Sequence, residues 1–455
     1  MLKLSIGLMS GTSMDGIDAA LICTDGHHHI EELGHISISY NPAFRILLKA
    51  TEYTIKKMAE KCLAENMHSK EAILNLTATD FTHHLSAFLQ EKLKLSEPDI
   101  TRKMSELSQY LYGTEAKNNL NLVKPLAFED IIEHSTRLHA EAAHKLLEAT
   151  GYCANQITVV GCHGQAFFHR PSAGLSIILC NGPQLANHLN ITVVTDFRSR
   201  DIAFGGQGAP FAPLYHHALA YRDNKIPCVV VNCGGIANIT LIYNDNIEDL
   251  IGFDTGPGNG LLDNLVRQQT KGREQMDVNG HYGAAGKVDK TVLAALYDKA
   301  IIKDGCNYFS SQPPKSLDIN DLYLVPELDN LTFEDACRTL AVFTADSIVQ
   351  SLRLNSVSRP IPLRWILAGG GWNNPIILLE LTERLKQELG HTITVETADQ
   401  AGWSSQALEA QIFAYLAVRS LLKLPLSMPN TTRVSKPLSG GCAFYPMLRT
   451  ATCEV

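Results

Sequence analysis

The sequence predicts an α/β protein of two domains, each with a mixed β-sheet flanked by helices. The chain has 455 residues, which is too long for one compact core. Two similar glycine hairpins lie in opposite halves of the chain, and strand-loop-helix units follow each of them. The expected domains are residues 1–224 and 225–455, with the C-terminal helix and tail packing back on the first domain.

The two hairpins occupy segments 4–22 and 229–242. In each, an apolar run meets a turn of Gly with Ser, Thr or Asn, and a second apolar run follows. A turn rich in glycine leaves its backbone N–H groups unshielded, so they can converge on phosphate oxygens. Finding this turn twice predicts two related domains that face one ligand.

Helix and strand patterns alternate along the rest of the chain. Buried strands are expected over residues 157–160, 191–195 and 365–368, and helices over 128–148 and 376–389, the last opened by Pro375. The stretch 95–126 is polar and only weakly periodic, which predicts a peripheral elaboration on the first domain. The residues from 431 onward are interpreted as an irregular C-terminal cap.

Composition narrows the classes of partner. The formal net charge of -8 is spread along the chain without a basic block, which argues against a nucleic-acid partner. No apolar run has signal-peptide or membrane character, and the cysteines are scattered singly, as in a reduced cytoplasmic protein. The tract 27–29, three histidines after Asp25-Gly26, is interpreted as a solvated turn, with a metal site as the alternative.

The sharpest local signal is Gly-Thr-Ser-Met-Asp-Gly-Ile-Asp at residues 11–18. Thr12 and Ser13 can donate hydroxyl hydrogen bonds, the glycines allow close backbone approach, and Asp15 and Asp18 can orient Mg²⁺ or its waters. The segment lacks the Gly-Lys-Ser/Thr ending of a Walker loop, so a hairpin turn must hold the phosphate. The alternative is an ordinary hairpin with an Asp-Gly turn.

Other polar loops follow predicted strands. The glycine run 369–371, with Asn373 after it, suits contact with adenosine or the α-phosphate. Segments 161–165 and 196–210 place Gln165, Arg198, Asp201 and Gln207 just past strand ends, where parallel sheets build their sites. These side chains can bind sugar hydroxyls, an amide or a carboxylate, or they can stabilise the loops by pairing Arg with Asp.

Two carboxylates are candidates for catalysis. Asp254 lies in Gly-Phe-Asp-Thr-Gly-Pro-Gly-Asn, residues 252–259, where rigid backbone suits a general base; the alternative is an Asx-turn that ends a strand. Glu409 lies in an apolar helical run and either reaches solvent or points into the site.

Together these motifs resemble the anhydro-N-acetylmuramic acid kinase family, within the actin, hexokinase and heat-shock chaperone superfamily. The resemblance rests on Gly-Leu-Met-Ser-Gly-Thr-Ser-Met-Asp-Gly-Ile-Asp at 7–18, His-Gly-Gln at 163–165, the segment 196–210 and the segment 252–259, all in family order. It implies two actin-like (ribonuclease H-like) domains with the active-site cleft between them.

The resemblance also implies the site residues. ATP would contact Gly11, Thr12, Ser13, Met14, Asp15, Gly16, Ile17, Asp18, Gly234, Gly235, Asn238, Gly369, Gly370, Gly371 and Asn373. The sugar would contact His163, Gln165, Asp196, Arg198, Asp201, Gln207, Gly256 and Asn259. Asp15 and Asp18 would hold Mg²⁺ and Asp254 would be the base. Glu409 matches a glutamate of the family's late helix, which favours the orientation into the site and makes it the second catalytic residue.

The activity implied is an ATP-dependent opening of 1,6-anhydro-N-acetylmuramic acid. Water attacks the anomeric carbon, and the freed 6-oxygen takes the γ-phosphate, giving N-acetylmuramic acid 6-phosphate and ADP. The chain departs from the family pattern at Gln400-Ala401 and at Leu317-Asp318, positions that bear on sugar specificity and domain closure.

Two other functions stay open at this stage. One is an actin-like ATPase that switches partner binding without a sugar, and the other is a kinase acting on another amino sugar. The expected partners are small molecules, without nucleic acid or membrane, and whether the protein forms a homodimer is left open.

Overall fold

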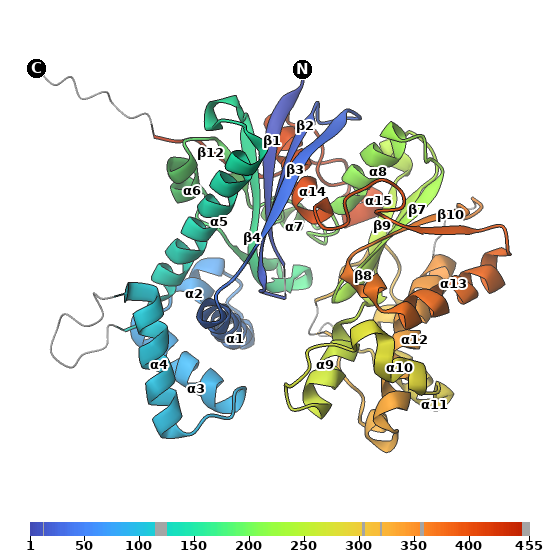
Figure 1. The fold of residues 1–455 in the computed structure, drawn as a ribbon, viewed down its shortest axis with the longest axis horizontal. Helices are drawn as coiled ribbons and strands as arrows, with labels where there is room; N and C mark the ends of the chain where they lie inside the picture. The colour runs from blue at the N-terminus through green and yellow to red at the C-terminus, as the bar shows by residue number, and fades with distance from the viewer. Residues whose placement is uncertain (12, 114–124, 303–304, 319–320, 355–358, 448–455) are drawn as a thin grey trace, which may run out of the picture. The chain divides into compact units, whose positions relative to one another are not determined.

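The computed structural model describes residues 1–455 except 12, 114–124, 303–304, 319–320, 355–358 and 448–455. The chain folds into two compact units, each of which draws on separate stretches of sequence (Figure 1). Unit 1 comprises Met1–Ala203, Glu409–Pro425 and Ser439–Val455, and unit 2 comprises Phe204–Leu408 and Leu426–Leu438.

The division falls earlier than the sequence places it, after residue 203 instead of 224. The reason is helix α8 (Ala212–Arg222), which packs on the sheet of unit 2. His216 Nδ1 lies 3.0 Å from Thr240 Oγ1 in that sheet, and a Cβ on Gly252 would meet Pro213 at 2.4 Å. Residues 204–224 therefore belong with unit 2.

Unit 1 is built on a mixed sheet of seven strands in the order β12-β6-β4-β1-β2-β3, with β5 pairing β4. The strands are β1 (Lys3–Ser10), β2 (Gly16–Thr24), β3 (Ile30–Ser39), β4 (Val159–Arg170), β5 (Leu175–Leu179), β6 (Val193–Thr195) and β12 (Cys442–Phe444). β2 is antiparallel to both β1 and β3, whereas β4 is parallel to β1 and β6. The expected hairpin over residues 4–22 is confirmed.

Unit 2 repeats this topology in a five-stranded sheet of order β11-β10-β7-β8-β9. The strands are β7 (Cys228–Cys233), β8 (Ile236–Ile242), β9 (Ile251–Pro257), β10 (Arg364–Ala368) and β11 (Thr394–Thr397). β8 is antiparallel to β7 and β9, and β10 is parallel to β7 and β11. The same order, with the second strand alone reversed in the five-strand core, is the ribonuclease H-like arrangement of actin-like domains, so the expected fold class is confirmed.

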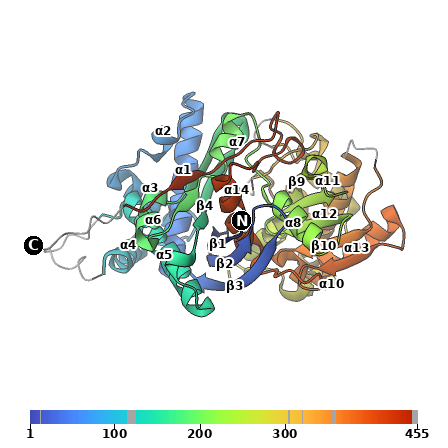
Figure 2. The same cartoon turned by 90° about the horizontal axis from the view of Figure 1, so that it is seen from above.

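Helices cover both faces of the sheet in unit 1 (Figure 2). The helices of unit 1 are α1 (Pro42–Ala64), α2 (Lys70–Leu74), α3 (Ala78–Glu91), α4 (Glu97–Tyr112), α5 (Phe128–Thr150), α6 (Gly182–Leu189), α7 (Ser199–Ala203) and α14 (Leu408–Leu421), of which α2, α3 and α4 pack on other helices. Because side chains alternate along a strand, Ile6 and Leu8 face the core under α1 and α5, and Gly7 faces α14. A Cβ on Gly7 would lie 1.8 Å from the Ala410 carbonyl oxygen, so glycine is what lets α14 approach the sheet.

The helices of unit 2 are α8, α9 (Gly260–Gln269), α10 (His281–Ala285), α11 (Lys290–Asp298), α12 (Phe333–Ser351), α13 (Pro375–Leu389) and α15 (Pro429–Thr432). α12 and α13 pack together over an apolar core that includes Trp365 and Phe343. The expected start of α13 is confirmed: Pro375 is its first residue, and Asn374 Oδ1 accepts a 3.0 Å bond from Ile376 N–H.

Helix α4 occupies the first part of residues 95–126, the stretch that the sequence predicts to be a peripheral elaboration. Ile100, Leu107 and Leu111 are buried in the core of unit 1, where α4 packs against α1, α3 and α5. The apolar residues are sparse enough for the helical period to look weak in sequence. Residues 114–124 of this stretch lie outside the described part of the chain.

The C-terminal segment is partly regular, against the expectation of an irregular cap. Residues 442–444 form β12, which pairs antiparallel with β6 at the sheet edge of unit 1.

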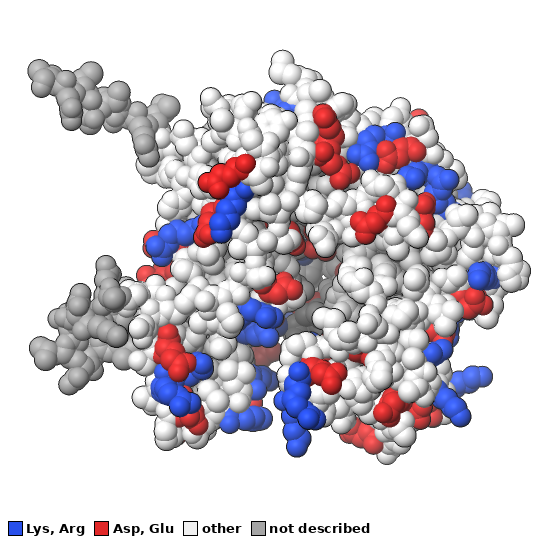
Figure 3. Space-filling view, in the orientation of Figure 1, with Lys and Arg blue, Asp and Glu red and all other residues white. Residues whose placement is uncertain are grey.

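In the part of the chain that the structure describes, every helix is too short or too polar to cross a bilayer. On the face shown in Figure 3, Lys and Arg are interspersed with Asp and Glu, so neither sign forms a continuous field there.

Candidate active site

The turn of the first hairpin is a compact, polar corner. Ser13 Oγ donates to Asp15 Oδ1 at 2.7 Å, and Met14, which has a φ of 53°, donates its N–H to the Gly11 carbonyl at 3.1 Å. The Met14 side chain is buried, as is that of Ile17, so these two residues can offer a ligand only their backbone. Ser13 and Asp15 are exposed, and Thr12 lies outside the described residues.

The two glycines of this turn serve different purposes. A Cβ on Gly16 would lie 2.3 Å from the Ile38 carbonyl oxygen, so glycine is needed there for the close approach of β3. A Cβ on Gly11 would meet only Ser13 Oγ, at 3.6 Å, so the backbone at Gly11 stays accessible to a ligand.

Asp15 and Asp18 have the carboxylate chemistry that a hard divalent cation requires. Burial raises the pKa of Asp18 and the charge of Asp15 raises it further, while a 2.5 Å bond from Ser37 Oγ opposes this. A Mg²⁺ ion near both carboxylates would offset their mutual repulsion. The residues present therefore fit a magnesium site.

Gln165 connects the hairpin turn to β4. Its Nε2 donates to the Gly11 carbonyl at 3.0 Å, and its Oε1 accepts a 3.0 Å bond from Ser10 Oγ, which also shares a 2.6 Å bond with the Tyr40 hydroxyl. Gln165 is 1% exposed. Within unit 1, its observed hydrogen bonds hold the turn in place.

His163 and Gln165 lie inside β4, whereas the sequence placed them past the end of a strand. β4 continues through a glycine with φ of 76°, Gly164, and the register with β1 shifts there. This bulge redirects the side chains that follow. Periodicity could not reveal it, because an antiparallel partner, β5, extends the strand on its far side.

His163 holds Arg198. Its Nδ1 lies 2.8 Å from the Gly164 carbonyl oxygen and its Nε2 lies 3.0 Å from an Arg198 nitrogen. A carbonyl only accepts and a guanidinium only donates, so Nδ1 carries the proton and Nε2 accepts. Burial, together with the charge of Arg198, lowers the pKa of His163 to about 3, so this histidine stays neutral and orients a cation.

The segment 196–210 divides between the two units. In unit 1, Asp196 Oδ1 accepts bonds from the N–H (3.2 Å) and Oγ (2.6 Å) of Ser199 at the start of α7, and Asp201 is buried. In unit 2, Gln207 donates its N–H to Thr432 O at 2.6 Å, and its Oε1 accepts a 3.2 Å bond from Ser316 Oγ.

The turn of the second hairpin and residues 258–260 form one piece of structure. Gly258 N–H donates to the Gly235 carbonyl at 3.0 Å, and Asn259 N–H donates to the Gly234 carbonyl at 2.8 Å. A Cβ on Gly258 would lie 1.9 Å from Gly234 O, and one on Gly260 would lie 2.7 Å from Gly235 O. Gly258 and Gly260 are therefore required by the close packing of residues 258–260 against the turn at Gly234 and Gly235.

The glycine run 369–371 packs on the end of β7. A Cβ on Gly369 would lie 2.5 Å from Cys233 O, and one on Gly371 would lie 2.4 Å from Cys233 Sγ. Only open space surrounds Gly370 within the described chain, and Gly370 and Asn373 are exposed. These two residues are the part of the loop that a ligand can reach.

Two asparagine side chains near the turn of the second hairpin have buried acceptor atoms without a hydrogen-bond partner among the described residues. These atoms are Asn238 Oδ1 and Asn259 Oδ1. Asn259 Nδ2 donates to Asp263 Oδ2 at 2.6 Å, and burial raises the pKa of Asp263 to about 6. Asp263 lies in the first turn of α9 and shows no motif in the sequence.

Asp254, on β9, is held through both its backbone and its carboxylate. Its N–H donates to Lys315 O at 3.0 Å, its carbonyl accepts a 2.5 Å bond from the Tyr308 hydroxyl, and its Oδ2 accepts a 2.8 Å bond from Leu317 N–H. The residue is 7% exposed. A carboxylate fixed this firmly, with a small accessible surface, suits a general base.

Lys315 and Tyr308 hold the main chain of Asp254, and neither residue belongs to a motif that the sequence shows. Lys315 Nζ donates to Tyr308 O at 2.8 Å and lies 4.3 Å from the centre of the Tyr308 ring. Burial lowers the pKa of Lys315 to about 8, and the charge of Asp254 opposes this. Burial also raises the pKa of Tyr308 well above its usual value, so its hydroxyl stays protonated and donates.

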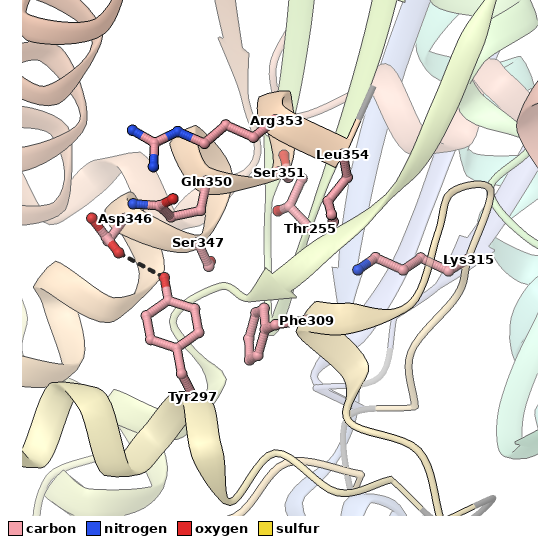
Figure 4. Close-up of a pocket in the computed structure, with 10 residues that line it drawn as sticks. All are labelled: Thr255, Tyr297, Phe309, Lys315, Asp346, Ser347, Gln350, Ser351, Arg353 and Leu354. Atoms are coloured by element: carbon pink, nitrogen blue, oxygen red, sulfur yellow. Dashed lines mark hydrogen bonds between the residues drawn. The ribbon is translucent and has the colours of Figure 1, made fainter. Parts of the chain in front are cut away.

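A cavity of about 400 Å³ lies between β9, the 308–317 segment and α12 in unit 2 (Figure 4). Thr255 and Lys315 line it from β9 and the 308–317 segment, and α12 contributes the facing wall. Its lining residues are Thr255, Tyr297, Phe309, Lys315, Asp346, Ser347, Gln350, Ser351, Arg353 and Leu354. A Cβ on Gly256 would lie 2.8 Å from Ser347 Oγ, so this glycine brings β9 close to α12.

Glu409 is exposed in the first turn of α14, in unit 1. Its neighbour Ala410 packs on Gly7, as noted above. The assignment of Glu409 to the active site stays a prediction.

Comparison with known proteins places these motifs in one family. The family model of anhydro-N-acetylmuramic acid kinase matches residues 106–446. The anhydro-N-acetylmuramic acid kinase of Methylobacterium nodulans is 36% identical over 443 residues, covering 97% of this chain and all of the relative. That of Methylorubrum populi is 39% identical over 447 residues, covering 98% of this chain and all of the relative.

Solved structures resemble the chain more distantly. A ROK family glucokinase from Streptomyces griseus has a TM-score of 0.35 at 11% identity, over 90% of this chain and 97% of that one, which is too low to support an inference. The family match, in contrast, extends over most of the chain and the two relatives over nearly all of it. The chain therefore belongs to the anhydro-N-acetylmuramic acid kinase family.

Proposed function

We propose that this protein is an ATP-dependent kinase that opens 1,6-anhydro-N-acetylmuramic acid with water and phosphorylates its 6-oxygen. The products are N-acetylmuramic acid 6-phosphate and ADP, and the reaction serves the recycling of peptidoglycan. The observation that carries the proposal is the 36–39% identity to kinases of this name across almost the whole chain. The environment of Asp254 is the second support.

In this mechanism Asp254 is the catalytic base. Its carboxylate takes a proton from water while the water oxygen bonds to the anomeric carbon and the bond from that carbon to the 6-oxygen breaks. The released 6-oxygen then attacks the γ-phosphorus and ADP leaves. The Leu317 N–H orients the carboxylate, and the bonds of Lys315 O and Tyr308 to the Asp254 backbone hold the strand beneath it.

Lys315 is a positioning residue in this proposal. Its Nζ donates to Tyr308 O, which connects the two ends of the 308–317 segment, and its own carbonyl accepts the Asp254 N–H. Its charge also opposes protonation of the Asp254 carboxylate, which keeps the base in its active form.

We assign phosphate binding to the backbone of the glycine turns, residues 11–16 in unit 1 and 234–235 in unit 2, with Gly370 and Asn373 available to the nucleotide. Asp15 and Asp18 are the residues that would hold Mg²⁺, which supplies positive charge to the transferred phosphoryl group. We assign sugar binding to the surroundings of the Asp254 carboxylate in unit 2 and, in unit 1, to Arg198, whose orientation His163 sets.

We also propose a cytoplasmic location, where ATP is available and the singly scattered cysteines stay reduced. Gln400-Ala401 and Leu317-Asp318 depart from the family pattern, and Leu317 contributes only its backbone N–H to Asp254. A different side chain at position 317 therefore leaves this bond to the base in place.

The proposal is tested by product analysis in ¹⁸O-water. Purified protein with ATP, Mg²⁺ and the anhydro sugar should release ADP much faster than with ATP alone, and mass spectrometry should find one solvent oxygen at the anomeric position. Equal ADP release without sugar would indicate an ATPase switch instead. Sugar phosphate lacking solvent oxygen would indicate a kinase acting on a free hydroxyl of another amino sugar.

A further inference from the structure

Three side chains that commonly bind metals meet at the end of the β2–β3 hairpin. Cys23, His29 and Glu31 each offer one ligand atom, and these atoms all lie within 4.8 Å of one another. β2 runs from Gly16 to Thr24, so this cluster is on the order of 20 Å along the strand from the glycine turn at residues 11–16. It is therefore separate, within unit 1, from the residues assigned to ATP.

The register of the hairpin brings these side chains together. Cys23 and Glu31 are directly paired across β2 and β3, and directly paired residues project to the same face of a sheet. His29 lies one residue before β3, at the end of the turn, and its side chain reaches the same cluster. Backbone pairing therefore places two of the three side chains on one face, and the turn supplies the third.

The turn that carries His29 is held in place. Asp25 Oδ1 accepts the N–H groups of His27 (2.8 Å) and His29 (3.1 Å). Helix α14 ties the same turn down, because Tyr415 donates its hydroxyl to His27 O and Arg419 donates to Gly26 O, both at 2.8 Å. Metal binding would therefore require little ordering of the backbone.

We propose that Cys23, His29 and Glu31 form a Zn²⁺ site, with water as the fourth ligand. A thiolate, an imidazole and a carboxylate are the ligand types that zinc takes in proteins, whereas Mg²⁺ and Ca²⁺ prefer oxygen alone. His29 and Glu31 are exposed, so the ion can enter from solvent. The tract 27–29 is then a turn, as the sequence indicated, of which one histidine also ligates metal.

The geometry needs only small adjustments. Ligand atoms at about 2.0–2.3 Å from a tetrahedral zinc ion lie roughly 3.3–3.8 Å from one another. Side-chain rotations that move each ligand atom by about 1 Å would therefore close the site. Burial and the charge of Glu31 raise the pKa of the Cys23 thiol. Zinc replaces that thiol proton, which passes to solvent.

The site bridges β2 and β3 next to the turn at residues 25–29 that joins them. The unfolded chain does not bring the three ligands together, so zinc binds the folded protein more tightly than the unfolded one. Zinc therefore raises the melting temperature of the protein. The role is structural.

The test is a Zn²⁺ titration of the full-length protein in competition with a chromogenic chelator. We expect one equivalent of Zn²⁺ to bind to the wild type. Its affinity should be at least about tenfold lower in Cys23→Ser and His29→Ala, because losing a metal ligand costs no less than losing a residue that hydrogen-bonds to a ligand. Cys153→Ser and His27→Ala are matched controls, because Cys153 and His27 are exposed and lie outside the cluster. Both controls should bind zinc as the wild type does.

Cobalt gives a second readout. Co²⁺ should produce a thiolate-to-metal charge-transfer band in the wild type and in both controls, but not in Cys23→Ser. The proposal is overturned if Cys23→Ser and His29→Ala bind zinc as tightly as the wild type, if no stoichiometric binding occurs, or if the cobalt band persists in Cys23→Ser. Sugar-dependent ADP release, unchanged in all variants, verifies that they are folded.

Discussion

Asp254 depends on an unusual amount of surrounding structure for a single carboxylate. Three hydrogen bonds from the 308–317 segment fix its main chain and its Oδ2, and Lys315 and Tyr308 stabilise that segment in turn. A base held this way needs no reorientation when water approaches, which is the preorganisation that general-base catalysis requires.

Replacing Asp254 by Asn should lower kcat by about 10²-fold or more, because the amide cannot take a proton but keeps the shape and can accept the Leu317 N–H bond. Steady-state assay of ADP release gives kcat, and nucleotide affinity measured by calorimetry should stay within about twofold of the wild type, as expected for a loss confined to chemistry. Full activity in the variant would remove Asp254 from the role of base.

Replacing Lys315 by Met should lower kcat by about 10- to 100-fold with a smaller effect on KM, since the 308–317 segment loses its anchor to Tyr308 O and the base is misplaced. The pKa of Lys315 is lowered to about 8, so its ammonium is present below that pH and lost above it. The neutral amine donates a weaker hydrogen bond to Tyr308 O than the ammonium does, so the wild-type to variant ratio of kcat should be largest below about pH 8 and fall above it.

A pH profile of kcat for both proteins tests this prediction. Lys299→Met is the control, because Lys299 is 43% exposed and pairs with Glu327 at the surface. A ratio that stays constant with pH would assign Lys315 a packing role only.

Helix α4 illustrates what an element contributes beyond its own sequence. It shows no side-chain cap at its start, and much of its surface is polar. Its buried residues nevertheless complete the core that α1, α3 and α5 begin. Burial of a few side chains outweighs weak local propensity when the neighbouring helices already supply the apolar surface.

Leu107→Ala should destabilise unit 1 by about 2–5 kcal/mol, because Leu107 is fully buried and its removal leaves a cavity. Urea-induced unfolding followed by circular dichroism measures the change. Leu93→Ala is the matched control: Leu93 is 41% exposed, and its replacement should change stability by no more than about 0.5 kcal/mol. Similar small effects at both positions would mean that α4 is peripheral.

At the scale of the whole molecule, the chain repeats one sheet topology in two units, and in each the same five strands are paired in the same way. Corresponding glycine turns join β1 to β2 and β7 to β8, each next to a strand parallel to the first of the pair. The chain contributes α14 and β12 to unit 1 only after it has completed most of unit 2.

The sequence by itself determined the two hairpins, the α/β class, the start of α13 and the family, because turns, periodicity and motif order are local properties of the chain. It did not reveal the core position of α4, the continuation of β4 through Gly164, or the separation of Gln207 from Asp196 into different units. Nor did it reveal that Lys315 and Tyr308 support Asp254, or that Cys23 meets His29 and Glu31. The tertiary structure decided these features, since each depends on strand pairing or burial between residues that are not neighbours along the chain.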